Sequence, residues 1–204
     1  MGHPKKAKKK YQTPSHPWQK DRLEEEKVLT KEYGLKNKKE LWKTDSNLRK
    51  VKRQAKKLIA ATTEQAQKEK QQLLSRLFKY GLAKKDSKVE DLLELTPKDF
   101  FGRRLQTLVF KKNLARSTTQ ARQFITHGHI FINNKKITVP SYFVSIDEEN
   151  KISYNPTSSL SKEGHPEHVT KKELKKEEKE VLDKKKKKEV KKEKRKEVKK
   201  EVKK

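Results

Sequence analysis

The chain has 204 residues and carries 56 Lys and Arg against 28 Asp and Glu, a formal net charge of +28. A basic excess of this size predicts a polyanionic partner, either nucleic acid or an anionic membrane surface. Without cysteine the chain cannot form disulfides or thiolate zinc sites, and hydrophobic residues, at 29%, predict a small core or one completed by a partner. No apolar run reaches the roughly 18 residues of a membrane span and no N-terminal apolar segment suggests secretion, so we expect an intracellular protein.

Residues 1–20 form a basic N-terminal extension with six lysines, no acidic residue and prolines at positions 4, 14 and 17. Proline and like charge both disfavour a packed element, so we expect this segment to become ordered only against a polyanion. Tyr11 and Trp18 lie among the lysines, a spacing typical of a tail that stacks on bases. The alternative is a solvated tail in which Trp18 packs on the following helix.

Residues 21–102 predict a helical domain. One helix runs from Asp21 to Tyr33 and ends at Gly34, and a second runs from Asn37, which forms a capping-box pattern with Glu40, to about Ala61. The second helix surrounds a thin apolar stripe with cations, among them Arg49 and Arg53. A membrane-surface helix also shows this pattern. The thin stripe favours the RNA backbone as the partner.

Three further helices are predicted before residue 115. Thr62 or Thr63 caps one that ends at Tyr80 and Gly81, and Ser87 with Glu90 begins a short one that ends at Leu93. The sequence Thr96-Pro97-Lys98-Asp99 is a helix start with threonine at the cap and proline at the first position. The helix that it opens places Arg104, Thr107 and Lys111 opposite its apolar side, with Arg103 nearby.

The segment from residue 115 to 142 predicts a capped helix and a tight hairpin. Ser117 and Gln120 form a capping box, and Gly128 follows the last turn, where a left-handed backbone is required. The two asparagines 133 and 134 suit a two-residue hairpin turn because Asn accepts positive φ. Opposite the apolar stripe of the helix lie four polar residues that we expect to face RNA: Thr119, Arg122, Gln123 and Thr126.

Beyond the hairpin, residues 142–146 and 152–154 predict strands on either side of an acidic turn, Asp147 to Asn150. Residues 155–170 are rich in Ser, Pro and Gly and predict a linker. Residues 171–204 are a Lys/Glu-rich tail whose four-residue repeats leave no straight apolar seam. We therefore expect marginal helix or disorder there.

The chain lacks the patterns of an enzyme. It holds neither a phosphate-binding glycine loop nor a nucleophile elbow, and no cofactor is predicted. His127 and His129 flank Gly128, but a closed metal site needs about four ligands and none is supplied nearby. We interpret the two histidines as structural or RNA-contacting residues, and expect no metal.

The segments RRLQTLV (103–109), ARQFI (121–125), HGHI (127–130) and PSY (140–142) resemble the S-four domain, the RNA-binding module named after the fourth small-subunit ribosomal protein. The N-terminal segments HPW (16–18) and YGLKNKKELW (33–42) extend the resemblance to the archaeal and eukaryotic type of that family, over roughly residues 3 to 160. Some bacterial members carry a cysteine zinc site that this chain cannot build. The resemblance implies an α-α-β module at residues 103–154 that grips folded RNA with its two helices.

Together these patterns predict an α+β protein with a mainly helical N-terminal domain, a small α-α-β RNA-binding module and basic tails. The resemblance implies a structural component of the small ribosomal subunit in the cytoplasm. It would bind ribosomal RNA directly and nucleate assembly of the subunit body. It would also lie near the messenger entry side, beside the fifth small-subunit protein. The alternative is a non-ribosomal RNA-binding factor of ribosome biogenesis. A third hypothesis, a membrane- or filament-binding protein, is supported only by the composition of the tails. We expect neither a membrane partner nor a homo-oligomer. The residues expected at RNA are Arg49, Arg53, Arg103, Arg104, Thr107, Lys111, Ser117, Thr119, Arg122, Gln123, Thr126, His127 and His129.

Overall fold

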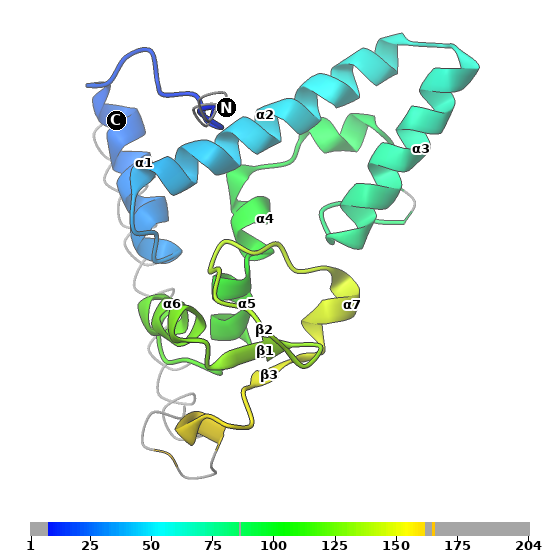
Figure 1. Ribbon diagram of the computed structural model, residues 1–204. Helices are drawn as coiled ribbons and strands as arrows, with labels where there is room; N and C mark the ends of the chain where they lie inside the picture. The colour runs from blue at the N-terminus through cyan, green and yellow to red at the C-terminus, as the bar shows by residue number, and fades with distance from the viewer. Residues whose placement is uncertain (1–7, 86, 162–164, 166–204) are drawn as a thin grey trace, which may run out of the picture. The chain divides into compact units, whose positions relative to one another are not determined.

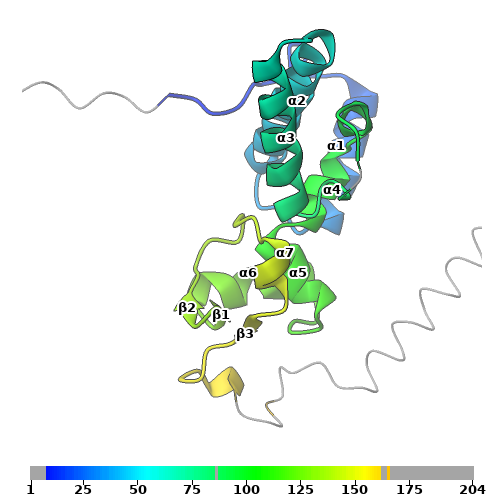
Figure 2. The same cartoon turned by 90° about the vertical axis from the view of Figure 1, so that its right-hand side faces the viewer.

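A computed structural model of the chain describes residues 8–85, 87–161 and 165, and all of its elements belong to one compact unit, residues 1–167. The predicted α+β class is confirmed, because the structure contains several helices and a three-stranded antiparallel sheet of order β2-β1-β3 (Figures 1 and 2). The Lys/Glu-rich tail, residues 171–204, lies outside the described residues. In chain order the elements are α1 (Lys20–Glu32), α2 (Lys38–Ala60), α3 (Glu64–Lys79), the 3-10 helix η1 (Glu90–Leu93), α4 (Pro97–Gly102), α5 (Leu105–Lys111), α6 (Thr118–His127), β1 (Ile130–Ile132), β2 (Lys135–Lys136), α7 (Ile146–Glu149), β3 (Ile152–Tyr154) and the 3-10 helix η2 (Ser159–Ser161).

Residues 8–19 form a strap that is held against α1 and α2. The backbone amide of Gln12 donates to Ser46 Oγ at 3.0 Å, and the Tyr11 ring stacks on Trp42 with centroids 6.1 Å apart. The expectation that this segment orders only on a polyanion is therefore wrong for residues 8–19. The alternative that Trp18 packs on the following helix is also wrong, because the side chain is 89% exposed.

Helices α2, α3 and α4 and the 3-10 helix η1 surround a core to which α2 contributes one side, whereas Leu29 of α1 packs in a second, smaller cluster. Leu48, Val51 and Ala55 of α2 pack against Leu73 and Leu77 of α3, which folds back from the end of α2 (Figure 1). The caps explain where α3 begins: Thr63 Oγ1 accepts from the amide of Ala66 at 3.3 Å. The predicted bounds of α1, α2 and α3 hold to within about two residues.

The helix expected to start at Thr96 is broken into two. Its start is confirmed, since the Asp99 carboxylate accepts from the Thr96 amide at 2.8 Å. However, α4 ends at Gly102 and α5 begins at Leu105. The reason is tertiary: the amide of Leu105 donates to Tyr142 O at 2.9 Å, and Arg104 forms a β-bridge with Phe143. These bonds replace the intrahelical ones at the break.

The module core lies between α5, α6 and the sheet, which these two helices cover on one face (Figures 1 and 2). Ser117 caps α6 by accepting from the amide of Gln120 at 3.1 Å, and Gly128 ends the helix at φ 79°. The hairpin turn is confirmed too, with Asn133 and Asn134 at φ 50° and 60°. In the sheet, Ile132 of β1 pairs with Lys135 of β2 and with Ile152 of β3.

Three predictions on the last segment differ from the structure. Residues 142–146 form no strand, and the expected acidic turn is the short helix α7, because Ser145 and Glu148 build a reciprocal capping box at its start. The segment expected to be a linker begins with packed residues: Leu160, in η2, is 4% exposed and belongs to the module core. This buried leucine and the 2.7 Å hydrogen bond between Ser158 Oγ and His129 Nδ1 hold the turn against the module despite its Ser-rich composition.

Candidate nucleic-acid interface

The outer face of α6 is polar and open. Ala121, Phe124 and Ile125 are buried in the module core, which turns the opposite side of the helix outward. As predicted, that exposed side carries Thr119, Gln123 and Thr126, with Ser117 at its start and His127 at its end. The N-terminus of this helix adds a positive dipole end, which favours a phosphate.

The hairpin extends this face with two exposed lysines, Lys135 and Lys136. Lys136 lies across Gly128, so closely that a Cβ there would be 1.9 Å from Lys136 Cε. His129 lies beside it and shares a 2.7 Å hydrogen bond between Nδ1 and Ser158 Oγ. Burial lowers the pKa of His129, and the nearby His127 and Lys136 lower it further. His129 is therefore a neutral, partly structural residue at neutral pH.

The surrounding sequence is free of acidic residues. Residues 100–146 contain eight Lys and Arg and no Asp or Glu. Any carboxylate that neutralises the module between those positions must therefore come from another part of the chain. This long acid-free run is a sequence signal that helical periodicity does not reveal.

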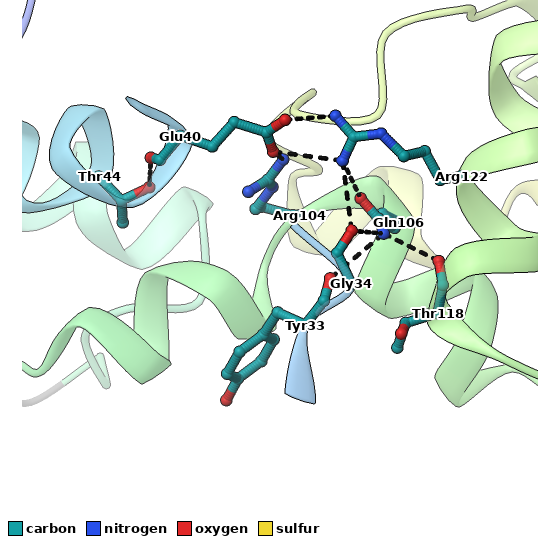
Figure 3. A network of polar contacts seen from close by, with 8 residues as sticks. All are labelled: Tyr33, Gly34, Glu40, Thr44, Arg104, Gln106, Thr118 and Arg122. Atoms are coloured by element: carbon teal, nitrogen blue, oxygen red, sulfur yellow. Dashed lines mark hydrogen bonds and ion pairs between the residues drawn. The ribbon is translucent and has the colours of Figure 1, made fainter. Parts of the chain in front are cut away.

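Glu40, at the start of α2, supplies such a carboxylate (Figure 3). Its Oε2 accepts from Arg104 Nη2 at 2.7 Å, and its Oε1 forms an ion pair with Arg122 Nη2. Burial alone would raise the pKa of Glu40, but hydrogen bonds from Arg122 and Arg104 outweigh it and hold that pKa below its usual value. Glu40 therefore stays ionised and joins α2 to both helices of the module.

Gln106 completes this polar junction. Its Nε2 donates to Gly34 O at 2.9 Å and to Thr118 O at 2.8 Å, while its Oε1 accepts from Arg122 Nη1 at 3.2 Å (Figure 3). The loop between α1 and α2 is thereby bonded to the start of α6. We call this set of side chains, Glu40, Arg104, Gln106 and Arg122, the junction cluster.

The junction cluster corrects part of the predicted interface. Arg104 is 3% exposed and Thr107 is 5% exposed, so neither lies on an open polar face. Arg122 is turned toward Glu40, and Arg103 pairs with Glu149 at 2.7 Å. α2 and the loop before it cover Arg104 and Arg122, and Arg103 lies against Glu149 of α7, so the predicted polar side is not open at these positions. That these four residues contact RNA stays a prediction.

The capping box predicted for Asn37 and Glu40 is also wrong. Asn37 makes no side-chain cap bond, and the Glu40 carboxylate reaches the module arginines. Two guanidinium groups compete more strongly for a carboxylate than one backbone amide does, since charge-assisted bonds are the stronger ones. Glu40 thus joins distant parts of the fold, whereas the sequence pattern predicted only a local role.

Other predicted residues lie where expected. Arg49 and Arg53 are exposed on α2, and Lys111 is exposed at the end of α5. Across the described ranges, no helix is long and apolar enough to cross a bilayer. The same residues hold no group of three or more His, Cys, Asp or Glu side chains that could bind a metal ion.

Comparison with known proteins agrees with this geometry. Residues 103–150 match the S4 domain. Small ribosomal subunit protein uS4 of Methanococcus aeolicus is 51% identical over 170 residues, 83% of this chain and 96% of the relative. The proteins of the same name from Methanothermobacter thermautotrophicus and Methanococcus vannielii are each 47% identical, over 80% and 83% of this chain and 95% and 96% of their own lengths.

The α5-α6 pair and its sheet are therefore an S4 domain, which places the chain in the class of S4-domain RNA-binding proteins. The similarity over most of the chain is specific enough to name the family. This chain belongs to the uS4 family of small ribosomal subunit proteins.

Proposed function

We propose that the chain is a structural component of the small ribosomal subunit that binds small-subunit ribosomal RNA directly, in the cytoplasm, and that it has no catalytic role. The observation that carries this proposal is the open face of α6, in a stretch without acidic residues, with its helix start at Ser117 and the exposed Lys136 across Gly128 at its other end. Phosphate contacts and shape recognition supply the binding, because A-form RNA hides its base edges in a deep groove.

Three finer features follow from the family resemblance. We propose that the chain binds early and nucleates assembly of the subunit body, that it lies near where messenger RNA enters, and that its protein neighbour is the fifth small-subunit protein. Membership of the uS4 family supports these roles. Arg49 and Arg53 offer a second set of exposed cations on α2 for the same RNA.

The orientation of α6 is tested by Ser117→Asp. Aspartate caps a helix as well as serine does, so the melting temperature should be retained. Its charge repels a phosphate approaching the helix start, so affinity for transcribed small-subunit ribosomal RNA should fall. The salt dependence of binding should also become shallower, because the added negative charge reduces the net positive charge that faces the RNA.

The matched control is Thr63→Asp, which places the same charge at the capped start of α3. We expect this variant to keep both stability and RNA affinity. Equal RNA binding by Ser117→Asp and the parent would show that α6 faces away from RNA. Sedimentation separates a ribosomal component from an assembly factor, because only the component remains with mature subunits in moderate salt.

A further inference from the structure

Trp18 is the most exposed of the large hydrophobic side chains within residues 8–85 and 87–161, at 89%, against 62% for the next, Val28. Isolated exposed apolar side chains are common on protein surfaces. A tryptophan in this position differs because of its area, and because the backbone that carries it is fixed. We therefore interpret its exposure as a sign of a ligand-binding site rather than of a disordered tail.

Arg22 fixes the backbone before Trp18. Its Nη2 donates to His16 O at 3.0 Å and to Pro17 O at 2.8 Å, while its Nη1 pairs with Glu26. Glu26 is itself held by Lys38 at 3.1 Å. Pro17 restricts its own φ, and α1 begins at Lys20, two residues beyond Trp18. The indole is thus presented from a constrained turn.

A basic hollow of about 610 Å³ lies along the strap that carries Trp18. Two of its lining residues, His16 and Gln19, flank the Pro17-Trp18 pair in sequence. The hollow has no acidic lining residue, and its basic side chains come from the strap, α1 and α2. The lining residues are Lys9, Tyr11, Gln12, Thr13, Pro14, Ser15, His16, Gln19, Arg22 and Arg49.

We propose that Trp18 and this basic hollow bind an unpaired nucleotide of ribosomal RNA, with its base stacked on the indole and its phosphate in the hollow. A cationic groove beside an exposed aromatic ring is the arrangement that binds single strands. The nucleotide must be unpaired, because a base within an A-form helix has no free face. The inference rests on the proposed function and adds a second site, on the helical half of the protein.

The charge of the lining decides against a protein occupant. Arg22 is already paired with Glu26, but Lys9 and Arg49 would need acidic partners on that protein, whereas one RNA phosphate backbone neutralises both. Val28 of α1 provides the contrast. Its neighbours one turn away are Glu24, Glu25 and Glu32 with a single cation, Lys31, so their net charge is negative and disfavours RNA.

The test measures binding of the full chain to transcribed small-subunit ribosomal RNA for Trp18→Ala, Trp18→Leu and Trp18→Phe. Loss of one base stack should weaken binding by about 5- to 150-fold for Trp18→Ala. Trp18→Leu should weaken it by a similar factor, and Trp18→Phe should keep most of the affinity because it retains a ring. The factor should not change with salt, since no charge is removed. Val28→Ala is the matched control and should bind as the parent does.

Fluorescence gives an independent reading. The emission of the parent minus that of Trp18→Phe isolates Trp18 from Trp42, and RNA should quench that difference signal. Parental affinity in Trp18→Ala, or in Trp18→Leu, would overturn the stacking site while leaving the proposed function intact. Failure of the parent itself to bind the RNA would overturn both. Circular dichroism should be the same for all variants, because the Trp18 side chain contributes to no core.

Discussion

Buried polar groups near α5 are handled in two different ways. Arg104 is charged and buried, and its guanidinium is paired with Glu40. Thr107 is equally buried, but its hydroxyl has no hydrogen-bond partner among the residues that the structure describes. Removing one partner of a buried ion pair lowers the stability of the protein, because the other charge is left unpaired. Removing a buried hydroxyl that has no hydrogen-bond partner does not, because the hydroxyl itself is destabilising. The two residues therefore predict opposite outcomes of mutation.

Thr107→Val keeps the shape of the side chain and removes the hydroxyl. We expect it to be neutral or to raise the free energy of unfolding by up to about 1 kcal/mol, since burying an unbonded hydroxyl is unfavourable. Urea denaturation measures this. Thr126→Val, at an exposed position of α6, should change stability by less than about 0.5 kcal/mol. A clear loss in Thr107→Val would show that the hydroxyl is bonded in solution.

Glu40→Gln should lower the free energy of unfolding by about 2–4 kcal/mol at pH 7. Breaking a buried pair costs roughly 3–5 kcal/mol, and this carboxylate is one-fifth exposed, which reduces the loss. Arg122→Ala should also destabilise the protein, because Arg122 shares that carboxylate.

The pH dependence of this loss follows from the lowered pKa of Glu40. A depressed pKa in the folded state gives stability that is present above the unfolded value of about 4.3 and is lost as the pH falls through the folded pKa. The stability gap between parent and Glu40→Gln should therefore close below about pH 4. Glu69→Gln, an exposed change on α3, should show a small gap at every pH. A gap for Glu40→Gln that persists in acid would contradict the ion pair.

At the scale of the elements, local signals located most helices. The Thr63, Thr96 and Ser117 starts and the Gly128 end were all predictable, because a cap involves residues within one turn. The break between α4 and α5 was not, since it depends on backbone bonds to residues 140–144, about 40 positions away. A local sequence pattern cannot predict a hydrogen bond to so distant a residue.

The same limit applies to the candidate site. Periodicity correctly put Thr119, Gln123 and Thr126 on the outer face of α6. It could not show that α2 covers Arg104 and Arg122, because a polar side predicts solvent, RNA or a buried ion pair equally well. The available clue was the acid-free run of residues 100–146, whose arginines pair with Glu40 and Glu149 from outside it.

The loop between α1 and α2 gives the prediction at this scale. Gly34 has φ 59°, and a Cβ there would lie 2.7 Å from Thr118 Oγ1 and 2.9 Å from Gln106 Nε2. Gly34→Ala should therefore cost about 2 kcal/mol or more, from the left-handed backbone and from displacement of the junction cluster. Gly102→Ala is the control: its Cβ would meet only Lys111 Nζ at 3.8 Å, so thermal unfolding should change little. Equal melting temperatures for both variants would contradict the close approach.

At the scale of the whole molecule, charge is spread over folded and tail segments. Residues 166–204 hold 19 Lys and Arg and ten Asp and Glu, without an aromatic residue. They can add long-range attraction to RNA but offer no ring for a base.

A chain ending at His165 keeps the buried Leu160, so the module core should remain intact. We expect this shortened chain to bind ribosomal RNA with parental affinity at high salt and to associate more slowly at low salt, because only the long-range attraction is reduced. Stopped-flow association rates and equilibrium binding across a salt series measure the two effects. Loss of binding at high salt would assign direct RNA contacts to the tail.

The position of Glu40 in the chain has a consequence for biosynthesis. The carboxylate precedes Arg104 by 64 residues and Arg122 by 82, so it leaves the ribosome first. Because N-terminal segments fold first during translation, α2 can be in place when the arginines emerge. Arg104 and Arg122 can then pair with Glu40 as soon as they are synthesised, before RNA binds the module. A circularly permuted chain that makes residues 103–161 first would lack that protection, and its nascent form should be the more prone to bind RNA or aggregate prematurely.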